Sequence, residues 1–324
     1  MTTLIVIPTL NEAAHIGAVL DGIAGFAASH DARIVVADGG STDGTRAIVT
    51  ERALQTEHLH FLDNPLRFQS AAVNLAVETH GTNCEMLIRL DAHSAYPSDF
   101  CEVLLREAST TGADSVVVTM HAIGQGPLQR IVAAAQNSRF GNGASAHRNR
   151  TKGAWVDHGH HALMRIAAFR QVGGYDPDFS HNEDAELDYR LRQAGFRIWL
   201  TAKTGIEYFP RATLSGLMLQ YFRFGRGRAR NLAKHHARPA RRQSLVAALA
   251  PALLLSLLTP VHPVFALPLM FWILGCIAAG VLIIRESRSP RNILAGPVAG
   301  LMQLSWSAGF WRQKLAPATG RGTP

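Results

Sequence analysis

Hydroxyl and carboxylate side chains follow the first two short apolar runs of the chain. The stretch from Pro8 to Glu12 follows the first run, and the stretch from Asp38 to Thr45 follows the second. Glycines in the second stretch allow close backbone approach, and a carboxylate there could accept hydrogen bonds from a nucleobase or a ribose. Plain βα connections use similar Asp-Gly turns, so neither stretch alone decides between nucleotide binding and a simple turn.

A later apolar run ends near Asp91, and His93 follows two residues further on. An acid at a strand end, with a second potential ligand beside it, could hold a divalent metal against a diphosphate. An Asx turn that caps a helix near Ser98 explains the same residues without a metal. The spacing leaves both interpretations open.

Glu183 and Asp184 form an acidic pair just before an amphipathic segment that contains Leu187 and Leu191. We expect the pair at or near the start of a helix, where the helix dipole stabilises carboxylates. Acids are common at helix starts, so a catalytic interpretation of this pair depends on the motifs that accompany it.

The elements that must position these residues alternate along residues 3–121. Short apolar runs, which we expect to be strands, cover 4–7, 34–37, 59–62, 86–90 and 115–120. Between the first two runs, apolar residues recur at helical spacing from Ile16 to Phe26, and Asn11 is placed as the N-cap of that helix. The pattern predicts an α/β fold with a mostly parallel sheet and helices on both faces. Such sheets bind ligands at the carboxyl ends of their strands.

The C-terminal part contains an apolar stretch that favours a membrane segment. Residues 245–284 form a run of 40 residues without Asp, Glu, Lys or Arg, interrupted by Pro260 and Pro263. A helix of that length is about twice the thickness of a bilayer, so we expect a hairpin of two spans in preference to a buried helix pair. The stretch 293–311 is richer in Gly and Ser, and a third span and an interfacial helix fit it equally.

Charge is unevenly distributed along the chain, whose net charge is +8. Residues 1–207 hold 17 Lys and Arg against 23 Asp and Glu, whereas 208–324 hold 15 Lys and Arg against Glu286 alone. Both flanks of the hairpin are basic, which places them on the cytoplasmic side. The basic run 223–242 abuts the hairpin, so it indicates contact with anionic lipid and not with nucleic acid. Three widely spaced cysteines indicate a reducing compartment.

Taken together, the motifs resemble those of the family-2 glycosyltransferases, inverting enzymes with the GT-A fold, a Rossmann-like nucleotide-binding fold. The matching residues are Pro8, Asn11 and Glu12, the stretch from Asp38 to Thr45, Asp91 to His93, and Glu183 with Asp184. The resemblance covers residue 3 to about residue 225. More narrowly, the stretches 89–93, 140–143 and 220–227 and the C-terminal hairpin resemble the ExoA-type glucosyltransferases of succinoglycan assembly.

The resemblance implies an activity and roles for individual residues. The activity is transfer of a hexose, with glucose the expected sugar, from a UDP-sugar to a polyprenyl-diphosphate-linked saccharide in exopolysaccharide biosynthesis.

Asp184 matches the general base, and Glu183 would orient it or the acceptor. On the nucleotide-sugar side the candidates are Pro8, Thr9, Glu12, Asp38, Asp43, Asn74 and Asp91. On the acceptor and diphosphate side they are Gln220, Arg223, Phe224, Trp155 and His161, of which Trp155 or His161 could stack on a sugar. Membrane-surface charge explains Arg223 equally well.

The resemblance also implies a divalent metal, Mg²⁺ or Mn²⁺, bound by Asp91 and His93. Most of the family has a second Asp where this chain has His93. Imidazole suits transition metals better than Mg²⁺, so the histidine leaves the identity of the metal open. The nearby cluster of Asp157, His158, His160 and His161 lacks the spacing of a zinc site, and we expect it to line the acceptor pocket.

The expected organisation is a GT-A domain at 1–215, a basic juxtamembrane segment at 216–243 and an α-helical membrane domain at 244–324. The catalytic domain would face the cytosol at the cytoplasmic membrane. Expected partners are the UDP-sugar donor, the lipid-linked saccharide acceptor, anionic lipids and other polysaccharide-assembly enzymes, with no nucleic acid. The main alternative is a polyprenyl-phosphate glycosyl synthase. A processive polymer synthase, a degenerate relative, a non-catalytic membrane scaffold and a nucleic-acid-binding protein are weaker alternatives.

Overall fold

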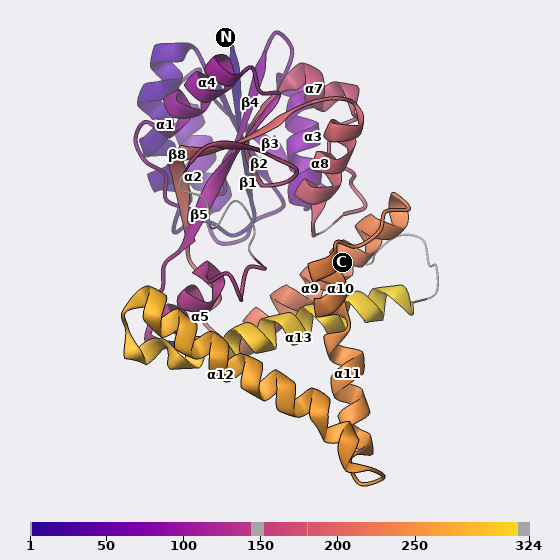
Figure 1. Ribbon diagram of the computed structural model, residues 1–324. Helices are drawn as coiled ribbons and strands as arrows, with labels where there is room; N and C mark the ends of the chain where they lie inside the picture. Colours follow the sequence, from indigo (N-terminus) through magenta and orange to yellow (C-terminus); the bar gives the residue numbers. More distant parts are fainter. Residues whose placement is uncertain (1, 144–151, 180, 317–324) are drawn as a thin grey trace. The chain divides into compact units, whose positions relative to one another are not determined.

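The computed structural model describes residues 2–143, 152–179 and 181–316 (Figure 1). The chain divides into an α/β unit, made of residues 1–120 and 150–207, and a helical unit, made of residues 121–149 and 208–324. The segment 121–149 therefore groups with the C-terminal helices. The predicted domain boundaries at 215 and 243 fall inside helices α9 (Leu214–Lys234) and α10 (Arg241–Ala247). The end of the predicted membrane domain, 317–324, lies outside the described residues.

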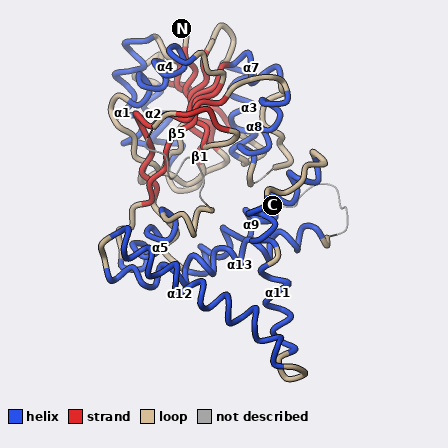
Figure 2. The backbone as a smooth tube through the Cα atoms, in the orientation of Figure 1, coloured by secondary structure: helices blue, strands red, loops and turns tan. Residues whose placement is uncertain are grey.

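The α/β unit is built on an eight-stranded sheet with the order β3-β2-β1-β4-β7-β5-β8-β6. Figure 2 shows its strands in red, with helices around them. Its strands are β1 (Thr3–Thr9), β2 (Arg33–Asp38), β3 (Leu59–Asp63), β4 (Met86–Arg89), β5 (Ser115–Ala122), β6 (Ala154–Val156), β7 (His160–Arg165) and β8 (Ile198–Tyr208). Strands β1 to β4 pair in parallel, whereas β7 runs antiparallel between β4 and β5. The five predicted strands are confirmed, with ends that differ by no more than two residues, and so is the mostly parallel sheet.

Helices cover both faces of the sheet, as the sequence predicts (Figure 1). On one face lie α1 (Ile16–His30), α2 (Thr45–Ala53) and α4 (Phe100–Thr111), and on the other lie α3 (Gln69–His80), α7 (Ile166–Gln171) and α8 (Glu183–Gln193). Alternate side chains of β1 divide between the two cores: Ile5 and Ile7 enter the first, and Leu4 and Val6 enter the second. Both faces of a strand must be apolar when it is covered twice, which explains the continuous apolar runs.

The predicted start of α1 is wrong. Helix α1 begins at Ile16 after His15, and Asn11 instead has a left-handed backbone conformation with φ of 58°. The Asn11 side-chain oxygen accepts a hydrogen bond of 2.9 Å from the backbone N–H of Thr42. Because this oxygen is engaged by the loop after β2, Asn11 joins two loops and does not cap the helix that follows it.

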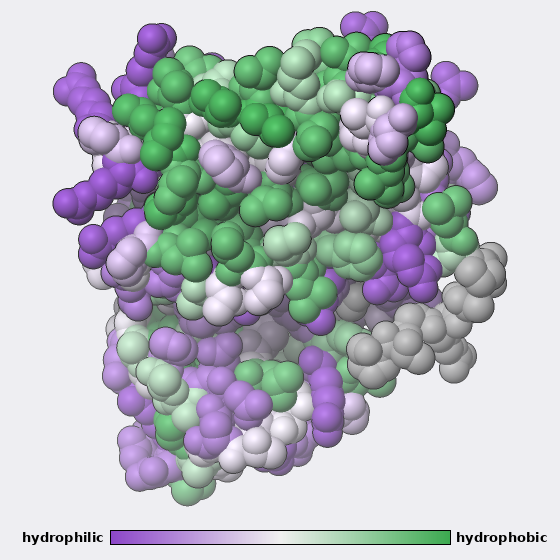
Figure 3. Space-filling view, turned by 90° about the horizontal axis from the view of Figure 1, so that it is seen from below, coloured by the Kyte–Doolittle hydropathy of each residue, from purple (hydrophilic) through white to green (hydrophobic). Residues whose placement is uncertain are grey.

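The helical unit contains the helices on both sides of the predicted hairpin. They are α5 (Pro127–Asn137), α9, α10, α11 (Leu249–Leu255), η1 (Ser256–Leu258), η2 (Pro263–Ala266), α12 (Leu267–Ser287), η3 (Pro290–Leu294) and α13 (Ala295–Lys314). Two stretches, Arg241–Leu258 and Pro263–Ser287, are long and apolar enough to cross a membrane, which by itself is weak evidence for a membrane segment. Exposed apolar side chains of these stretches include Leu254, Leu257 and Phe271, and Figure 3 shows a broad hydrophobic area on the face seen from below.

Helix α13, which covers the third predicted apolar stretch, is the packed centre of the helical unit. Its buried residues include Val298, Ala299 and Met302, which lie in one cluster with residues of α5, α9 and α12. Close approach of α9 and α13 depends on glycine: a Cβ added at Gly225 would overlap the carbonyl oxygen of Trp306. A Cβ added at Gly309 of α13 would likewise overlap the carbonyl oxygen of Phe222 on α9, so glycines of both helices serve their packing.

We expect Gly225→Ala to destabilise the helical unit by about 1–3 kcal/mol, because the added methyl group forces α9 away from α13. Thermal unfolding of the purified protein in detergent measures the effect. The matched control is Gly275→Ala on α12, where an added Cβ meets no atom within 4 Å. The control should keep or slightly raise the unfolding temperature. Equal unfolding temperatures for the two variants would contradict the packing argument.

Candidate active site

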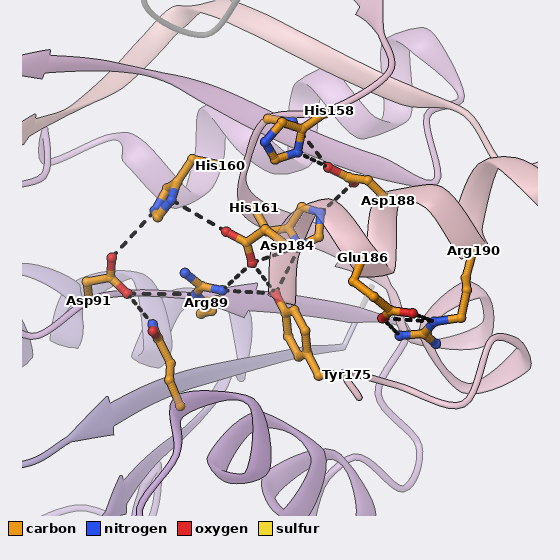
Figure 4. Close-up of polar contacts among 12 residues, drawn as sticks. Arg89, Asp91, His158, His160, His161, Tyr175, Asp184, Glu186, Asp188 and Arg190 are labelled. Carbon is orange, nitrogen blue, oxygen red and sulfur yellow. Dashed lines mark hydrogen bonds and ion pairs between the residues drawn. The ribbon is translucent and has the colours of Figure 1, made fainter. Parts of the chain in front are cut away.

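Arg89, the last residue of β4, lies at the centre of the site (Figure 4). Its side chain is only 3% exposed. One of its terminal nitrogens donates to Oδ1 of Asp184 at 2.7 Å and to the Tyr175 hydroxyl at 2.9 Å. Its Nε lies 3.7 Å from Oδ1 of Asp91. A single guanidinium thus joins the acid after β4 to the acid at the start of α8.

Asp91 is held from several directions. Gln69, the first residue of α3, donates to its Oδ1 at 2.7 Å, and Nε2 of His160 lies 3.5 Å from its Oδ2. The backbone N–H of Asp91 donates to the Tyr96 hydroxyl at 2.6 Å. Burial by itself would raise the pKa of this carboxyl, but Arg89 and His160 outweigh burial and hold the pKa well below its usual range. Asp91 is therefore a fixed anion.

Asp184 and Glu183 have opposite pKa shifts although they are neighbours. Burial raises the pKa of Glu183, and the negative charge of Asp184 raises it further. Burial opposes ionisation of Asp184 as well, but Arg89 and His161 outweigh it and lower the pKa of Asp184 well below its usual range. Asp184 is consequently ionised at neutral pH, as a general base requires.

Two successive histidines of β7 each lie near a different carboxylate oxygen of Asp184. Nδ1 of His160 is 3.7 Å from Oδ2, and Nδ1 of the fully buried His161 is 3.5 Å from Oδ1. Nε2 of His161 is 2.6 Å from Oδ1 of Asp188, and Nδ1 of His158 is 2.7 Å from Oδ2 of Asp188 (Figure 4). Since Asp188 lies one helical turn after Asp184 on α8, one helix face supplies both acids.

The loops after β1 and β2 are joined by side chains of the predicted nucleotide motifs. The backbone N–H of Glu12 donates to Thr45, and that of Ala13 donates to Asp43, each at 2.9 Å. Hydrogen bonds from Thr45 and Ala13 lower the pKa of Asp43. The motif acids at this place therefore fix the shape of the strand ends, and their contact with a nucleotide stays a prediction.

Asp38 is also part of this loop structure. Its side chain has no exposed surface, and it accepts hydrogen bonds from Gly40, Ser41 and the guanidinium of Arg46. Thr9, at the end of β1, is buried and lies 3.4 Å from the same carboxylate. Pro8, in β1, is partly exposed. The roles predicted for these residues toward a nucleotide stay predictions.

Asn74 has a structural role in addition to the one predicted. Its amide nitrogen donates to the carbonyl of Tyr175 at 2.7 Å, and its oxygen accepts from the Tyr175 N–H at 2.8 Å. Both ends of the amide bond to protein backbone, and the predicted nucleotide contact of Asn74 stays a prediction. Asn74 anchors Tyr175, and through it the hydroxyl that donates to Asp184.

Two predicted acceptor contacts are wrong. The His161 ring has no exposed surface, so it cannot stack on a sugar. Trp155 lies on β6, where it pairs with Trp199 at the start of β8 and where Arg197 lies 3.6 Å from its ring centre. The Arg197 carbonyl accepts from Ser115, the first residue of β5. Trp155 is therefore at the edge where β5 begins, opposite to the carboxyl ends of the parallel strands.

The remaining predicted residues are placed as follows. Gln220, Arg223 and Phe224 lie on α9 of the helical unit, where Gln220 donates to the Tyr208 hydroxyl at 3.0 Å and Arg223 is exposed. Their predicted role toward diphosphate or acceptor stays a prediction. His93 places its Nδ1 2.9 Å from the carboxylate of Glu12.

A resident metal would have few protein ligands here. Among the described residues, no three His, Cys, Asp or Glu side chains group as a metal site. Mg²⁺ is commonly held by one or two carboxylates, with phosphates and waters completing its coordination. Asp91, ionised and at a strand end, suits that kind of site, and His93 leaves Nε2 as its second possible donor.

Sequence reasoning missed Arg89, Gln69, Tyr175 and Asp188 as members of the site, whereas it placed His160 in the acceptor pocket. Arg89 carried a signal, because a single charged residue interrupts an otherwise apolar strand. Asp188 carried another, since it follows Asp184 at four-residue spacing. The partners of Gln69 and Tyr175 are far away along the chain, and no local pattern indicates them.

We expect Arg89→Gln to reverse the pH dependence of stability. In the natural chain, the lowered pKa values of Asp91 and Asp184 contribute stability above pH of about 4, and that stability is lost as the pH falls. Without the guanidinium, burial raises both pKa values, so the stability falls as the pH rises. At neutral pH the loss should be about 3–5 kcal/mol, measured by thermal unfolding.

The control for this experiment is Arg192→Gln, which breaks an exposed pair with Asp157. Exposed pairs contribute little, so this variant should unfold like the natural chain at every pH. If the stability of Arg89→Gln depended on pH in the same way as that of the natural chain, the central role of the guanidinium would be refuted.

Comparison with known proteins agrees with this geometry. The family model for glycosyl transferase family 2 matches residues 4–173. The succinoglycan biosynthesis protein ExoA of Rhizobium meliloti (strain 1021) is 52% identical over 314 residues, which are 97% of this chain and 95% of that protein. The predicted resemblance is thus confirmed.

Two solved structures share the fold at low sequence identity. The mannosyltransferase PcManGT from Pyrobaculum calidifontis, in complex with GDP-Man and Mn²⁺, has a TM-score of 0.57 at 18% identity, with 97% of this chain and 87% of that chain covered. GalNAc-T7 with UDP, GalNAc and Mn²⁺ has a TM-score of 0.51 at 15% identity, with 65% of this chain and 43% of that chain covered. The chain has a GT-A-like fold and belongs to glycosyltransferase family 2.

Proposed function

We propose that the chain transfers a hexose, with glucose the first candidate, from a UDP-sugar to a polyprenyl-diphosphate-linked saccharide during exopolysaccharide assembly. The bridge that Arg89 forms between Asp91 and Asp184 carries the proposal. It brings a donor-side acid and a candidate base next to each other, as a single inverting displacement needs. The name of the relative from Rhizobium meliloti, a succinoglycan biosynthesis protein, supports the choice of pathway.

Asp184 would remove the proton of the acceptor hydroxyl. Its lowered pKa makes it a weak base toward a free hydroxyl group. The hydroxyl proton becomes far more acidic once the oxygen begins to bond to the anomeric carbon, so a weak base suffices if the proton moves late. Oδ1 already accepts from Arg89 and Tyr175, which leaves Oδ2 for the acceptor. Glu183, with its raised pKa, would help to orient the acceptor.

On the donor side, Asp91 and His93 would hold a divalent cation. The bound ion would neutralise charge on the diphosphate and make it a better leaving group. Glu12, which holds Nδ1 of His93, orients the histidine ring. The joined loops after β1 and β2, which carry the candidates Pro8, Thr9, Glu12, Asp38 and Asp43, would bind the nucleotide part of the donor.

The helical unit would bring the enzyme to the cytoplasmic membrane, with the catalytic residues on the cytosolic side. The two apolar stretches suited to crossing a membrane and the basic residues that flank them support this location. The domain organisation predicted from the sequence is part of the same proposal. Gln220, Arg223 and Phe224 on α9 are the candidates for the lipid diphosphate, because Arg and Gln offer directed donors to phosphate oxygens.

We expect Asp184→Asn to lower transfer by at least about a thousandfold, because the amide cannot accept the proton. Binding of UDP, measured by calorimetry, should stay within about threefold of the natural value. Asp31→Asn is the matched control, because Asp31 is a 90% exposed acid at the end of α1 and belongs to no part of the site. Retained transfer in Asp184→Asn would exclude Asp184 as the base.

The acceptor assay tests the function itself. Membranes containing the protein are incubated with labelled UDP-glucose and Mn²⁺, with either polyprenyl phosphate or a lipid-linked saccharide, and the product is identified by mass spectrometry. We expect label only on the lipid-linked saccharide. Label on polyprenyl phosphate would identify a polyprenyl-phosphate glycosyl synthase instead. A panel of other UDP-sugars determines the donor.

A further inference from the structure

The buried ring of His161 lies between Asp188 and the group that donates to the proposed base. Its Nε2 is 2.6 Å from Oδ1 of Asp188, and its Nδ1 is 2.8 Å from the Tyr175 hydroxyl (Figure 4). The Tyr175 hydroxyl in turn donates to Oδ1 of Asp184 at 3.0 Å. The question is which of the two ring nitrogens carries a proton.

The hydrogen bonds of the Tyr175 hydroxyl decide whether Nδ1 of His161 carries a hydrogen. A phenol has one proton to donate, and this proton points to Asp184. Arg89 donates to the same oxygen at 2.9 Å. Toward His161 the oxygen can therefore only accept, so Nδ1 must carry a hydrogen.

The carboxylate of Asp188 decides whether Nε2 of His161 carries a hydrogen. Asp188 is fully buried, and the backbone N–H of Gly159 donates to its Oδ2 at 3.2 Å, so the carboxylate acts as a hydrogen-bond acceptor. Burial would raise its pKa, but His161 and His158 outweigh burial and lower it. An ionised carboxylate only accepts hydrogen bonds, so Nε2 must donate to it. Both nitrogens then carry hydrogens, and the ring is an imidazolium cation.

We propose that His161 acts as a cationic positioning residue, which directs the Tyr175 proton to Oδ1 of Asp184 and so keeps Oδ2 for the acceptor hydroxyl. The inference rests on the proposed function, in which Asp184 is the base. The other neighbour of Asp184 on β7, His160, lies on the Oδ2 side and is partly exposed. The two oxygens thus face a buried and a more accessible environment, which fits one fixed oxygen and one reactive oxygen.

The charges around His161 favour the cation. Tyr175, Asp184 and Asp188 contact His161 directly, and Arg89 acts on it through its charge. Around these groups lie Asp91 after β4, Glu183 on α8, His160 on β7 and His158 in the loop before β7. Burial lowers the pKa of His161, and Arg89 lowers it too, but Asp188 and Asp184 outweigh both and raise it above its ordinary value.

A direction for the pH dependence follows. Because the pKa of His161 is raised, the cation persists to higher pH than a free histidine and is lost as the pH rises further. The neutral ring would then offer an unprotonated Nδ1, and the Tyr175 proton would turn to it and away from Asp184. The turnover number should therefore fall as the pH rises through the pKa of His161.

The test is the pH profile of kcat in membranes with saturating UDP-sugar and lipid-linked acceptor, from about pH 5.5 to 9.5. For the natural chain we expect kcat to fall at high pH, and we call this fall the basic limb of the profile. Asp188→Asn keeps an acceptor oxygen but removes the charge, so it should move the midpoint of that limb to lower pH by at least about one unit. The KM for the donor should change by less than about twofold, since His161 acts through Asp184 and not on the donor.

A double-mutant cycle gives a second test that does not depend on Asp188→Asn folding. His161→Gln and Tyr175→Phe should each lower kcat by about 10- to 100-fold and remove the basic limb. The kcat of the double variant should be no lower than that of the less active single variant. The matched control is His60→Gln. The half-buried ring of His60 stacks on His80, and this variant should keep the natural limb.

Three outcomes would overturn the inference. They are an unshifted basic limb in Asp188→Asn, a limb that persists in His161→Gln, and an activity that rises with pH through the midpoint. The last result would mean that neutral His161 accepts the proton which Asp184 removes. Failure of the proposed function is distinguishable, because the natural chain would then transfer no sugar to the lipid-linked saccharide at any pH.

Discussion

A buried positive charge in the middle of the sheet is the constraint on which the site depends. The Arg89 side chain is 3% exposed, and an unpaired cation there would cost several kcal/mol in desolvation. Asp91 comes directly after the same strand, whereas Tyr175 and Asp184 come from about ninety residues further along the chain. The Arg89 guanidinium is hydrogen-bonded to Tyr175 and Asp184 only when that distant segment docks over the end of β4. Assembly of the acids is therefore part of folding.

Local patterns could predict the strands, the two-sided sheet and the motif acids, because each is a property of neighbouring residues. Asn11 was misplaced because its partner, Thr42, is 31 residues away. The acceptor roles of Trp155 and His161 were wrong because the sequence does not show which edge of the sheet β6 reaches or which histidine of β7 is covered. Long-range hydrogen bonds to Asn74 are equally invisible in the sequence, although its chemistry suits them.

The antiparallel strand β7 explains how one histidine segment meets a single carboxylate from two sides. Inserted between β4 and β5, it begins where β4 ends, so its first residues enter the site. Side chains alternate along a strand, and His160 and His161 consequently reach different oxygens of Asp184. Asp188 then fixes the inner histidine from the same helix that carries the acid. The electrostatic state of Asp184 is thus set by the protein before any substrate binds.

Helix α3 links the two halves of the site mechanically. Gln69 in its first turn holds Asp91, and Asn74 just over one turn later holds the backbone of Tyr175. One rigid helix therefore fixes the spacing between the support of the donor-side acid and the support of the acceptor-side acid. Loops elsewhere in the chain can diverge to accept another saccharide without changing that spacing, whereas an insertion within α3 would separate leaving-group stabilisation from proton removal.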